Sequence, residues 1–179
     1  MKKKFKLKVL SILMAVLMVA TIIPMGAISS FAITSGDYEY SIIFEIGTSN
    51  DFVQITKYYG TGGDVTIPST IDGYTVTGIG FWTFNGRTSL RSVIIPDSVT
   101  IIEGNAFKGC TGLKSVTIGN SVTYIGINAF EGCTSLTSVI IPDSVTSIYW
   151  SAFYCCTSLM AINVSEGNTA YSSIDGVLY

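Results

Sequence analysis

Hydrophobic and polar positions in the second half of the chain recur at a fixed spacing of 23 residues. Lines that begin at Leu90, Leu113 and Leu136 each have this length, and a partial fourth line begins at Leu159. Each full line continues with Val-x-Ile, then Val-x-x-Ile, then an Ala-Phe pair. This order predicts a strand with one buried face, a second short strand and one helical turn. Repeats of this length are typical of a solenoid, in which each repeat forms one coil stacked on the last.

A single coil of this kind cannot be stable by itself. It offers roughly seven or eight buried side chains at about 1.5–3 kcal/mol each, whereas ordering it costs about 1.5 kcal/mol per residue. Stacking removes the deficit because neighbouring coils bury both flat faces and pair their strands. A globular fold would leave the regular recurrence of identical side chains unexplained. The sequence therefore predicts a β-rich repeat solenoid with a parallel strand ladder and short helical turns.

The repeats resemble those of the BspA-like class of bacterial leucine-rich repeats, whose pattern is close to L-x-x-V-x-I-P-x-S-V-x-x-I-G-x-x-A-F-x-G-C-x-x. The resemblance covers Leu90 to Leu159 fully and Val65 to Ser89 loosely. It implies a horseshoe-like leucine-rich-repeat fold. It also implies a secreted or surface-attached protein that acts in adhesion to host proteins or to other cells.

Residues 1–32 have the three parts of a secretory signal peptide. Five lysines are followed by the apolar run Val9–Ile23, which Pro24 ends, and Ser30 and Ala32 place small residues before a cleavage site. The alternative is an uncleaved anchor, but a membrane span needs about 20 apolar residues. We expect cleavage after Ala32, secretion to the medium or the cell surface, and no membrane span in the mature chain.

The remaining chain divides into a cap and a repeat domain. Residues 33–64 alternate in hydrophobicity in two segments, with a turn at 47–50, and predict N-terminal cap strands. Residues 65–179 form the leucine-rich-repeat domain, and an insertion between Ile67 and Val76 lengthens its first coil. The predicted coils are 65–89, 90–112, 113–135 and 136–158, with a partial coil at 159–179. Residues 166–179 leave the repeat. The resemblance implies that a stretch such as Ser173 to Tyr179 leads into a further strand and more sequence, so we expect the reading frame to continue past Tyr179.

Composition excludes several classes of function. The mature chain keeps five basic and all twelve acidic residues, a formal charge of −7, which argues against nucleic acid and anionic membranes as partners. The chain has no histidine, which excludes Ser-His-Asp and Cys-His catalysis and the common zinc sites. Asp97 and Asp143 recur at a turn, where we expect each to cap its own backbone. We predict no enzyme, no metal and no cofactor.

The cysteines follow the repeat. Cys110, Cys133 and Cys156 are 23 residues apart and predict a stacked ladder of buried thiols, because side chains that point the same way disfavour the dihedral angle of a disulfide. Cys155 replaces the glycine found at Gly109 and Gly132. A strained bond between Cys155 and Cys156 is the alternative.

Two surfaces are candidates for binding. The first is the outward face of the strand ladder, which repeat solenoids use for protein partners; β-propensity alone could also explain its two isoleucines. The second is a set of aromatic residues before the Ala-Phe pair, which could stack on sugars, anchor a protein or pack onto neighbouring coils. The strand face comprises Ser92, Ile94, Ser115, Thr117, Ser138, Ile140 and Asn163, and the aromatic patch comprises Phe81, Trp82, Tyr124, Tyr149 and Trp150.

These features favour a non-catalytic protein-binding or adhesion module that holds a protein partner, such as a host or other-cell surface protein, along its strand face. The second hypothesis is a structural spacer within a longer surface protein or enzyme. The third, which the aromatic patch supports less strongly, is carbohydrate binding.

Overall fold

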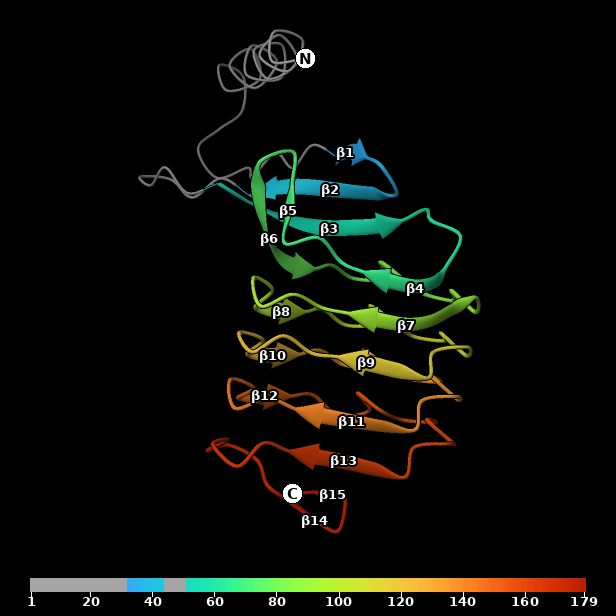
Figure 1. Cartoon of the computed structure of the whole chain (residues 1–179), viewed down its shortest axis with the longest axis vertical. Coiled ribbons are helices and arrows are strands. Elements are labelled where there is room, and N and C mark those ends of the chain that lie inside the picture. The colour runs from blue at the N-terminus through green and yellow to red at the C-terminus, as the bar shows by residue number, and fades with distance from the viewer. Residues whose placement is uncertain (1–31, 44–50) are drawn as a thin grey trace, which may run out of the picture. The chain divides into compact units, whose positions relative to one another are not determined.

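Two parallel ladders of short strands, on two sides of the stacked coils, form the body of the protein (Figure 1). The structure is a computed structural model that describes residues 32–43 and 51–179. These residues form a β-solenoid of about five turns, which confirms the predicted fold class. The predicted signal peptide and the turn at 47–50 lie outside the described residues.

The first ladder is built from the Val-x-Ile segments. Its register pairs residues that are one repeat apart, such as Val93 with Val116 and Val139 with Ile162. The strands of residues 63–117 and those of residues 138–164 form two separate hydrogen-bonded sheets of this ladder. The stack continues between them, where the Thr137 amide donates to the Lys114 carbonyl at 3.4 Å. The strands of this ladder are β4 (Gly63–Thr66), β7 (Leu90–Ile94), β9 (Ser115–Thr117), β11 (Ser138–Ile141) and β13 (Ala161–Val164).

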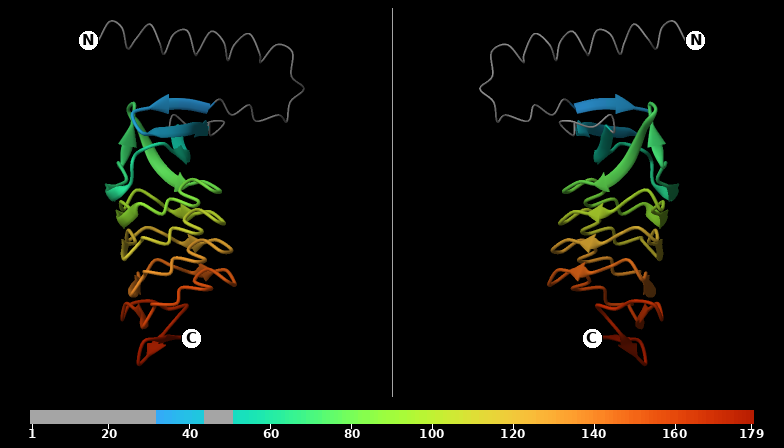
Figure 2. Two further views of the ribbon diagram at one scale, coloured as in Figure 1. Left: turned by 90° about the vertical axis from the view of Figure 1, so that its right-hand side faces the viewer. Right: turned by 90° about the vertical axis from the view of Figure 1, so that its left-hand side faces the viewer.

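The second ladder is built from the Val-x-x-Ile segments and is joined to the cap. Its pairs Ile102–Ile125 and Ile125–Ile148 are again one repeat apart and parallel. Figure 2 shows how the coils stack along one axis. The strands of this ladder are β3 (Phe52–Tyr58), β6 (Tyr74–Ile79), β8 (Ile101–Ile102), β10 (Tyr124–Ile125) and β12 (Ser147–Ile148).

The third side of each coil is a run of tight turns, and the predicted helical turns are absent from the described residues. The residue before each Thr/Ala-Phe pair has a positive φ, 59° at Asn105 and 56° at Asn128, which a right-handed helix cannot accommodate. Amides in this run alternate between partners in their own coil and partners in the next. For example, the Phe107 amide donates to Ala129 and the Lys108 amide to Asn105. The prediction was wrong here because the coil must return toward the first ladder within a few residues.

The core is a set of columns that run through all coils. The repeated Leu, Val, Ile, Ala and Phe positions of the second and third coils are buried, apart from the half-buried Val116. The phenylalanine column forms a continuous stack of rings with centroids 4.8 to 5.4 Å apart. This stack begins in the cap and comprises Tyr58, Phe84, Phe107, Phe130 and Phe153.

The N-terminal end is closed by the predicted cap strands and by one more strand. β1 (Ala32–Ser35), β2 (Tyr38–Ile43) and β3 form an antiparallel meander, and β3 then pairs parallel with β6. The insertion in the first coil forms β5 (Thr70–Ile71), which makes a hairpin with β6. The Asp72 carboxylate at the tip of this hairpin accepts hydrogen bonds from Tyr40 (2.8 Å) and Ser35 (3.0 Å). The hairpin thereby fastens the cap to the first coil.

The C-terminal residues fold back against the last coil. β14 (Ser173–Ile174) and β15 (Val177–Leu178) form a hairpin below β13 (Figure 1). The hydroxyl of Tyr171 accepts a hydrogen bond from the Ile148 amide at 2.7 Å, and Ser173 Oγ accepts one from Val164 at 3.0 Å. These contacts satisfy strand-edge amides of β12 and β13.

Candidate functional site

The predicted strand face, which we call the strand surface, lies on the outer side of the first ladder. Ser92 pairs with Ser115 and Ile94 with Thr117 in adjacent strands, and the pairs of Ser138 with Ala161 and Ile140 with Asn163 continue both rows. Ser92 is half-buried and the other six predicted residues are exposed. The structure therefore brings all seven together in two parallel rows. Their alternation with buried valines and isoleucines explains this placement.

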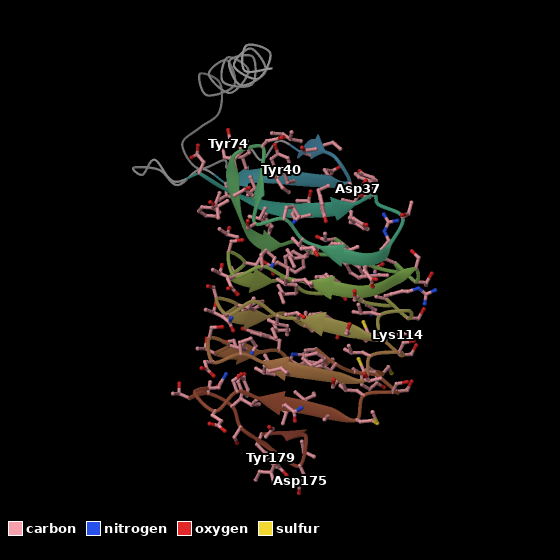
Figure 3. All side chains as sticks on the ribbon, viewed as in Figure 1. Asp37, Tyr40, Tyr74, Lys114, Asp175 and Tyr179 are labelled. Atoms are coloured by element: carbon pink, nitrogen blue, oxygen red, sulfur yellow. The ribbon has the colours of Figure 1, made fainter. Side chains whose placement is uncertain are left out.

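Two basic residues beside the strand surface, Arg91 and Lys114, were not predicted as part of a site. Arg91 and Lys114 are exposed, and the Lys114 amide donates to the Arg91 carbonyl at 2.8 Å, so the two side chains belong to adjacent coils. Lys114 lies next to the start of β9 (Figure 3). Ser92 Oγ also donates to the Asp64 carboxylate at 2.6 Å. Arg91 and Lys114 each follow the repeated Leu directly. This shared position in the repeat would have predicted that the two side chains lie in adjacent coils.

The predicted aromatic residues lie along the second ladder and the turns that follow it. The rings of Tyr124 and Tyr149 are 5.0 Å apart at an angle of 48°. Phe81 lies against Gly104, because a Cβ atom built on that glycine would come within 3.2 Å of Phe81 Cε1 and 3.0 Å of Ile127 Cγ2. All of the predicted aromatic residues except Tyr124 are exposed, and Trp150 is 73% exposed.

Sequence reasoning missed three aliphatic and acidic members of this region. Ile101 and Ile127 extend it across the second and third coils, and Ile101 pairs with Tyr124 in the ladder. Glu103 lies near Tyr124, and burial raises its pKa although a hydrogen bond from Gln54 opposes the shift. We call the full set the aromatic surface: Phe81, Trp82, Ile101, Glu103, Tyr124, Ile127, Tyr149 and Trp150.

Trp82 has an unusual backbone conformation. Its φ is +64°, in the left-handed region, at the position that Asn105 and Asn128 occupy in the next two coils. Asparagine tolerates this region, whereas a bulky side chain is rarely found there. The aromatic surface therefore includes a residue that the fold itself does not favour at that position.

The cysteines form the predicted ladder. The thiols of Cys110, Cys133 and Cys156 are free and buried, and each donates to the carbonyl of the phenylalanine one coil earlier, at 3.1 to 3.3 Å. A hydrogen bond with Cys110 and burial raise the pKa of the Cys133 thiol. Cys155 is also free but exposed, with a φ of +58°. The alternative bond between Cys155 and Cys156 is not formed.

Polar side chains outside the two candidate surfaces form hydrogen bonds and an ion pair between adjacent coils. Asp97 accepts a hydrogen bond from the Asn120 amide of the next coil at 2.7 Å rather than capping its own backbone, so that expectation was wrong at Asp97. Lys108 and Glu131 form an ion pair between adjacent coils at 2.8 Å. Within residues 32–43 and 51–179, no group of three or more acidic or cysteine side chains is placed to hold a metal ion. The same ranges contain no helix long and apolar enough to cross a membrane.

Comparison with known structures identifies bacterial leucine-rich repeat proteins with the same fold. One, from Bacteroides capillosus, has a TM-score of 0.63 and 26% identity over 75% of this chain and 98% of its own. A second, from T. pallidum, has a TM-score of 0.56 and 28% identity over 74% of this chain and 71% of its own. A leucine-rich cell surface protein from Faecalibacterium prausnitzii has a TM-score of 0.51 and 27% identity over 85% of this chain and 59% of its own.

No curated protein matches the chain. Residues 64–174 match the family described as BspA type Leucine rich repeat region, in six copies. The match begins at the first coil and extends beyond the last full line of the repeat into the C-terminal hairpin. With its paired ladders and repeated core columns, this chain belongs to the family of BspA-type leucine-rich repeat proteins.

Proposed function

We propose that the protein is a non-catalytic binding module of the bacterial cell surface, which holds a protein partner along its strand surface. The observation that carries this proposal is the exposure of Ile94 and Ile140, 46% and 61%, on the outer side of the first ladder. They flank Thr117 in one row, two coil steps or about 10 Å apart. Apolar side chains in regular exposed rows are available to a partner without any rearrangement of the coils.

The chemistry around these isoleucines supports a protein partner. Arg91 and Lys114 stand beside the two rows, and arginine is enriched at protein interfaces. The rows of serine and threonine add hydroxyl groups that can bond a polypeptide backbone. A partner that presents apolar side chains next to carboxylates would complement this surface. Surface location is supported by the similarity to a leucine-rich cell surface protein and by the predicted signal peptide.

The absence of histidine from the whole chain supports a role without catalysis. The exposed charged groups that the structure describes are spread over several coils, and the buried thiols are bonded to backbone carbonyls. We therefore assign the strand surface to the binding of a protein partner.

Site-specific photo-cross-linking tests the proposal. A cross-linking residue at Thr117 is compared with one at Tyr154, which is exposed in the turns of the fourth coil. Both proteins are incubated with intact bacterial cells and with cultured epithelial cells, and adducts are treated with protease. We expect a protease-sensitive adduct from position 117 alone, which disappears when Ile94 and Ile140 are both changed to Thr. Threonine already fills this row in the third coil, so the strands keep their shape.

Equal adducts from positions 117 and 154, or adducts that survive the double substitution, would contradict the proposal. The absence of adducts from either position would instead favour the spacer hypothesis.

A further inference from the structure

A second binding surface lies on the other ladder, and it goes beyond the proposed protein contact. We infer that the aromatic surface is a binding site for a neutral carbohydrate chain, which lies along the solenoid axis across several coils. The inference depends on the distribution of aromatic rings, on the backbone of Trp82 and on the charge of the surface. It uses none of the residues assigned to the protein partner.

The most exposed rings stand at the two ends of the aromatic surface. Phe81 and Trp82 belong to the first coil and are 58% and 54% exposed, whereas Tyr149 and Trp150 belong to the fourth. Three coil steps, or about 14 Å, separate the two groups. Protein hot spots instead cluster near the centre of an interface. Rings at both ends suit an extended ligand with a repeating structure, because the C–H faces of successive sugar rings can stack on aromatic faces.

A regular polar column lies beside the rings. Thr77, Thr100, Thr123 and Thr146 form this column, and the three last-named hydroxyls donate to the carbonyl one coil earlier at 3.1 to 3.3 Å. Each of these oxygens keeps lone pairs that can accept a bond from a ligand hydroxyl. The half-buried residues Asn105 and Asn128 occupy the Trp82 position in the second and third coils. A polymer with regularly spaced hydroxyls would meet equivalent groups in each coil.

The backbone at Trp82 gives independent support. A left-handed conformation is unfavourable for a bulky residue, and such backbone strain is concentrated at functional sites. The next two coils use asparagine at this position and the fourth uses Ser151, which has the same conformation, with φ of +62°. Folding therefore requires no tryptophan at this position. A tryptophan that is exposed and disfavoured by its own backbone is explained if it contacts a ligand.

The charge of the surface defines the class of carbohydrate. From the threonine column to the Trp82 column, across the four coils, the only charged side chain is Glu103. A carboxylate there, without a neighbouring lysine or arginine, would repel an acidic polysaccharide. It can accept hydrogen bonds from the hydroxyls of a neutral sugar or the amide of an N-acetylated one.

Intrinsic fluorescence provides a direct test, because Trp82 and Trp150 are the only tryptophans in the chain. The protein is titrated with cellohexaose, chitohexaose and mannohexaose, and with an oligogalacturonate of similar length as the acidic control. Variants Trp82→Asn and Trp150→Ala test the two ends of the surface. Asparagine already fills the first position in two other coils, so Trp82→Asn keeps the fold. Controls are Ile140→Thr on the strand surface and Tyr154→Ala, an exposed tyrosine outside both surfaces.

We expect at least one neutral oligosaccharide to shift the tryptophan emission, with an affinity that falls about tenfold or more in each tryptophan variant, the range of a binding hot spot. For the variants, binding is followed by calorimetry, because each has lost one reporter. Both controls should bind as the parent does. The inference is overturned if no neutral oligosaccharide binds, if the acidic one binds better, or if the tryptophan variants keep full affinity.

Discussion

The rings of Phe107 and Phe130 lie within 1° of parallel, with their centroids 5.0 Å apart. The two residues belong to consecutive coils, and both side chains are fully buried. Each coil therefore supplies one half of a contact that its neighbour completes, and five rings in succession connect the cap to the fourth coil. In such an arrangement the stability of a coil depends on its neighbours.

Truncation within this stack should destabilise several coils together. We expect Phe130→Ala to lower the free energy of unfolding by about 3–5 kcal/mol, the range for deleting a buried phenylalanine. Guanidinium unfolding measures the loss, and amide hydrogen exchange locates it. Protection should fall in the second, third and fourth coils alike. Phe153→Ala at the half-buried end of the stack is the matched control and should cost less. Faster exchange confined to the third coil would show that the coils are independent.

Cys155 should be replaceable by glycine with a gain in stability. Its φ of +58° matches Gly86, Gly109 and Gly132, whose φ values are 68°, 71° and 72° in the preceding coils. A side chain at this conformation costs roughly 1–2 kcal/mol that glycine does not. We expect Cys155→Gly to raise the thermal midpoint, and Cys155→Ala to give no comparable gain because alanine keeps the Cβ atom. An equal effect of both substitutions would assign the change to the thiol rather than to the backbone.

The four thiols should differ sharply in reactivity. Cys155 is exposed, whereas the other three are buried and bonded to carbonyl groups. Because the thiolate is the reactive form, the raised pKa values of the Cys133 and Cys156 thiols slow their modification further. Mass spectrometry after brief maleimide treatment should find one modification in the folded protein and four in guanidinium. Rapid modification of Cys133 in the folded protein would contradict the buried ladder.

Alkaline pH should destabilise the cap. Burial raises the pKa of Tyr38 to about 12, and burial together with a hydrogen bond to Asp72 raises the pKa of Tyr40. Because both tyrosines stay protonated in the folded state, their contribution is complete below the unfolded value of about 10 and is lost as the pH rises toward 12. The thermal midpoint, measured from pH 8 to pH 12, should therefore fall above pH 10.

Tyr40→Phe tests this assignment. The variant should be less stable at pH 8, because it loses the bond to Asp72, but its midpoint should fall less steeply above pH 10. Tyr154→Phe, an exposed position in the fourth coil, serves as the control and should follow the parent. If Tyr40→Phe declines as steeply as the parent, Tyr40 is not a source of the alkaline instability.

The core could be predicted because its signal is repeated. Leu90, Leu113 and Leu136 occupy one column and are fully buried, and the paired segments after them form the two expected ladders. Errors at single positions cancel when the same pattern occurs several times. The strand surface followed from the same alternation, since the residues between buried positions must point outward.

Features that occur only once were harder to predict. Tyr58 extends the phenylalanine stack into the cap, and Asp72 fastens the cap hairpin, but neither residue belongs to a repeated column. The turns were assigned as helical because Ala-Phe pairs suit a helix. Asn105 and Asn128, aligned with Trp82, were the signal for a left-handed position, because asparagine is enriched there.

The hydrogen bonds of the threonine column connect residues 23 apart in every case. Each new coil thus closes a loop of the same length, and the associated loss of chain entropy is the same at every step. The contact order relative to chain length would then fall as coils are added, which favours folding by propagation from any formed pair.

Insertion of a whole repeat preserves every column, whereas insertion of one residue in a strand reverses which side chains face the core. The unit by which this fold can change its length is therefore the coil.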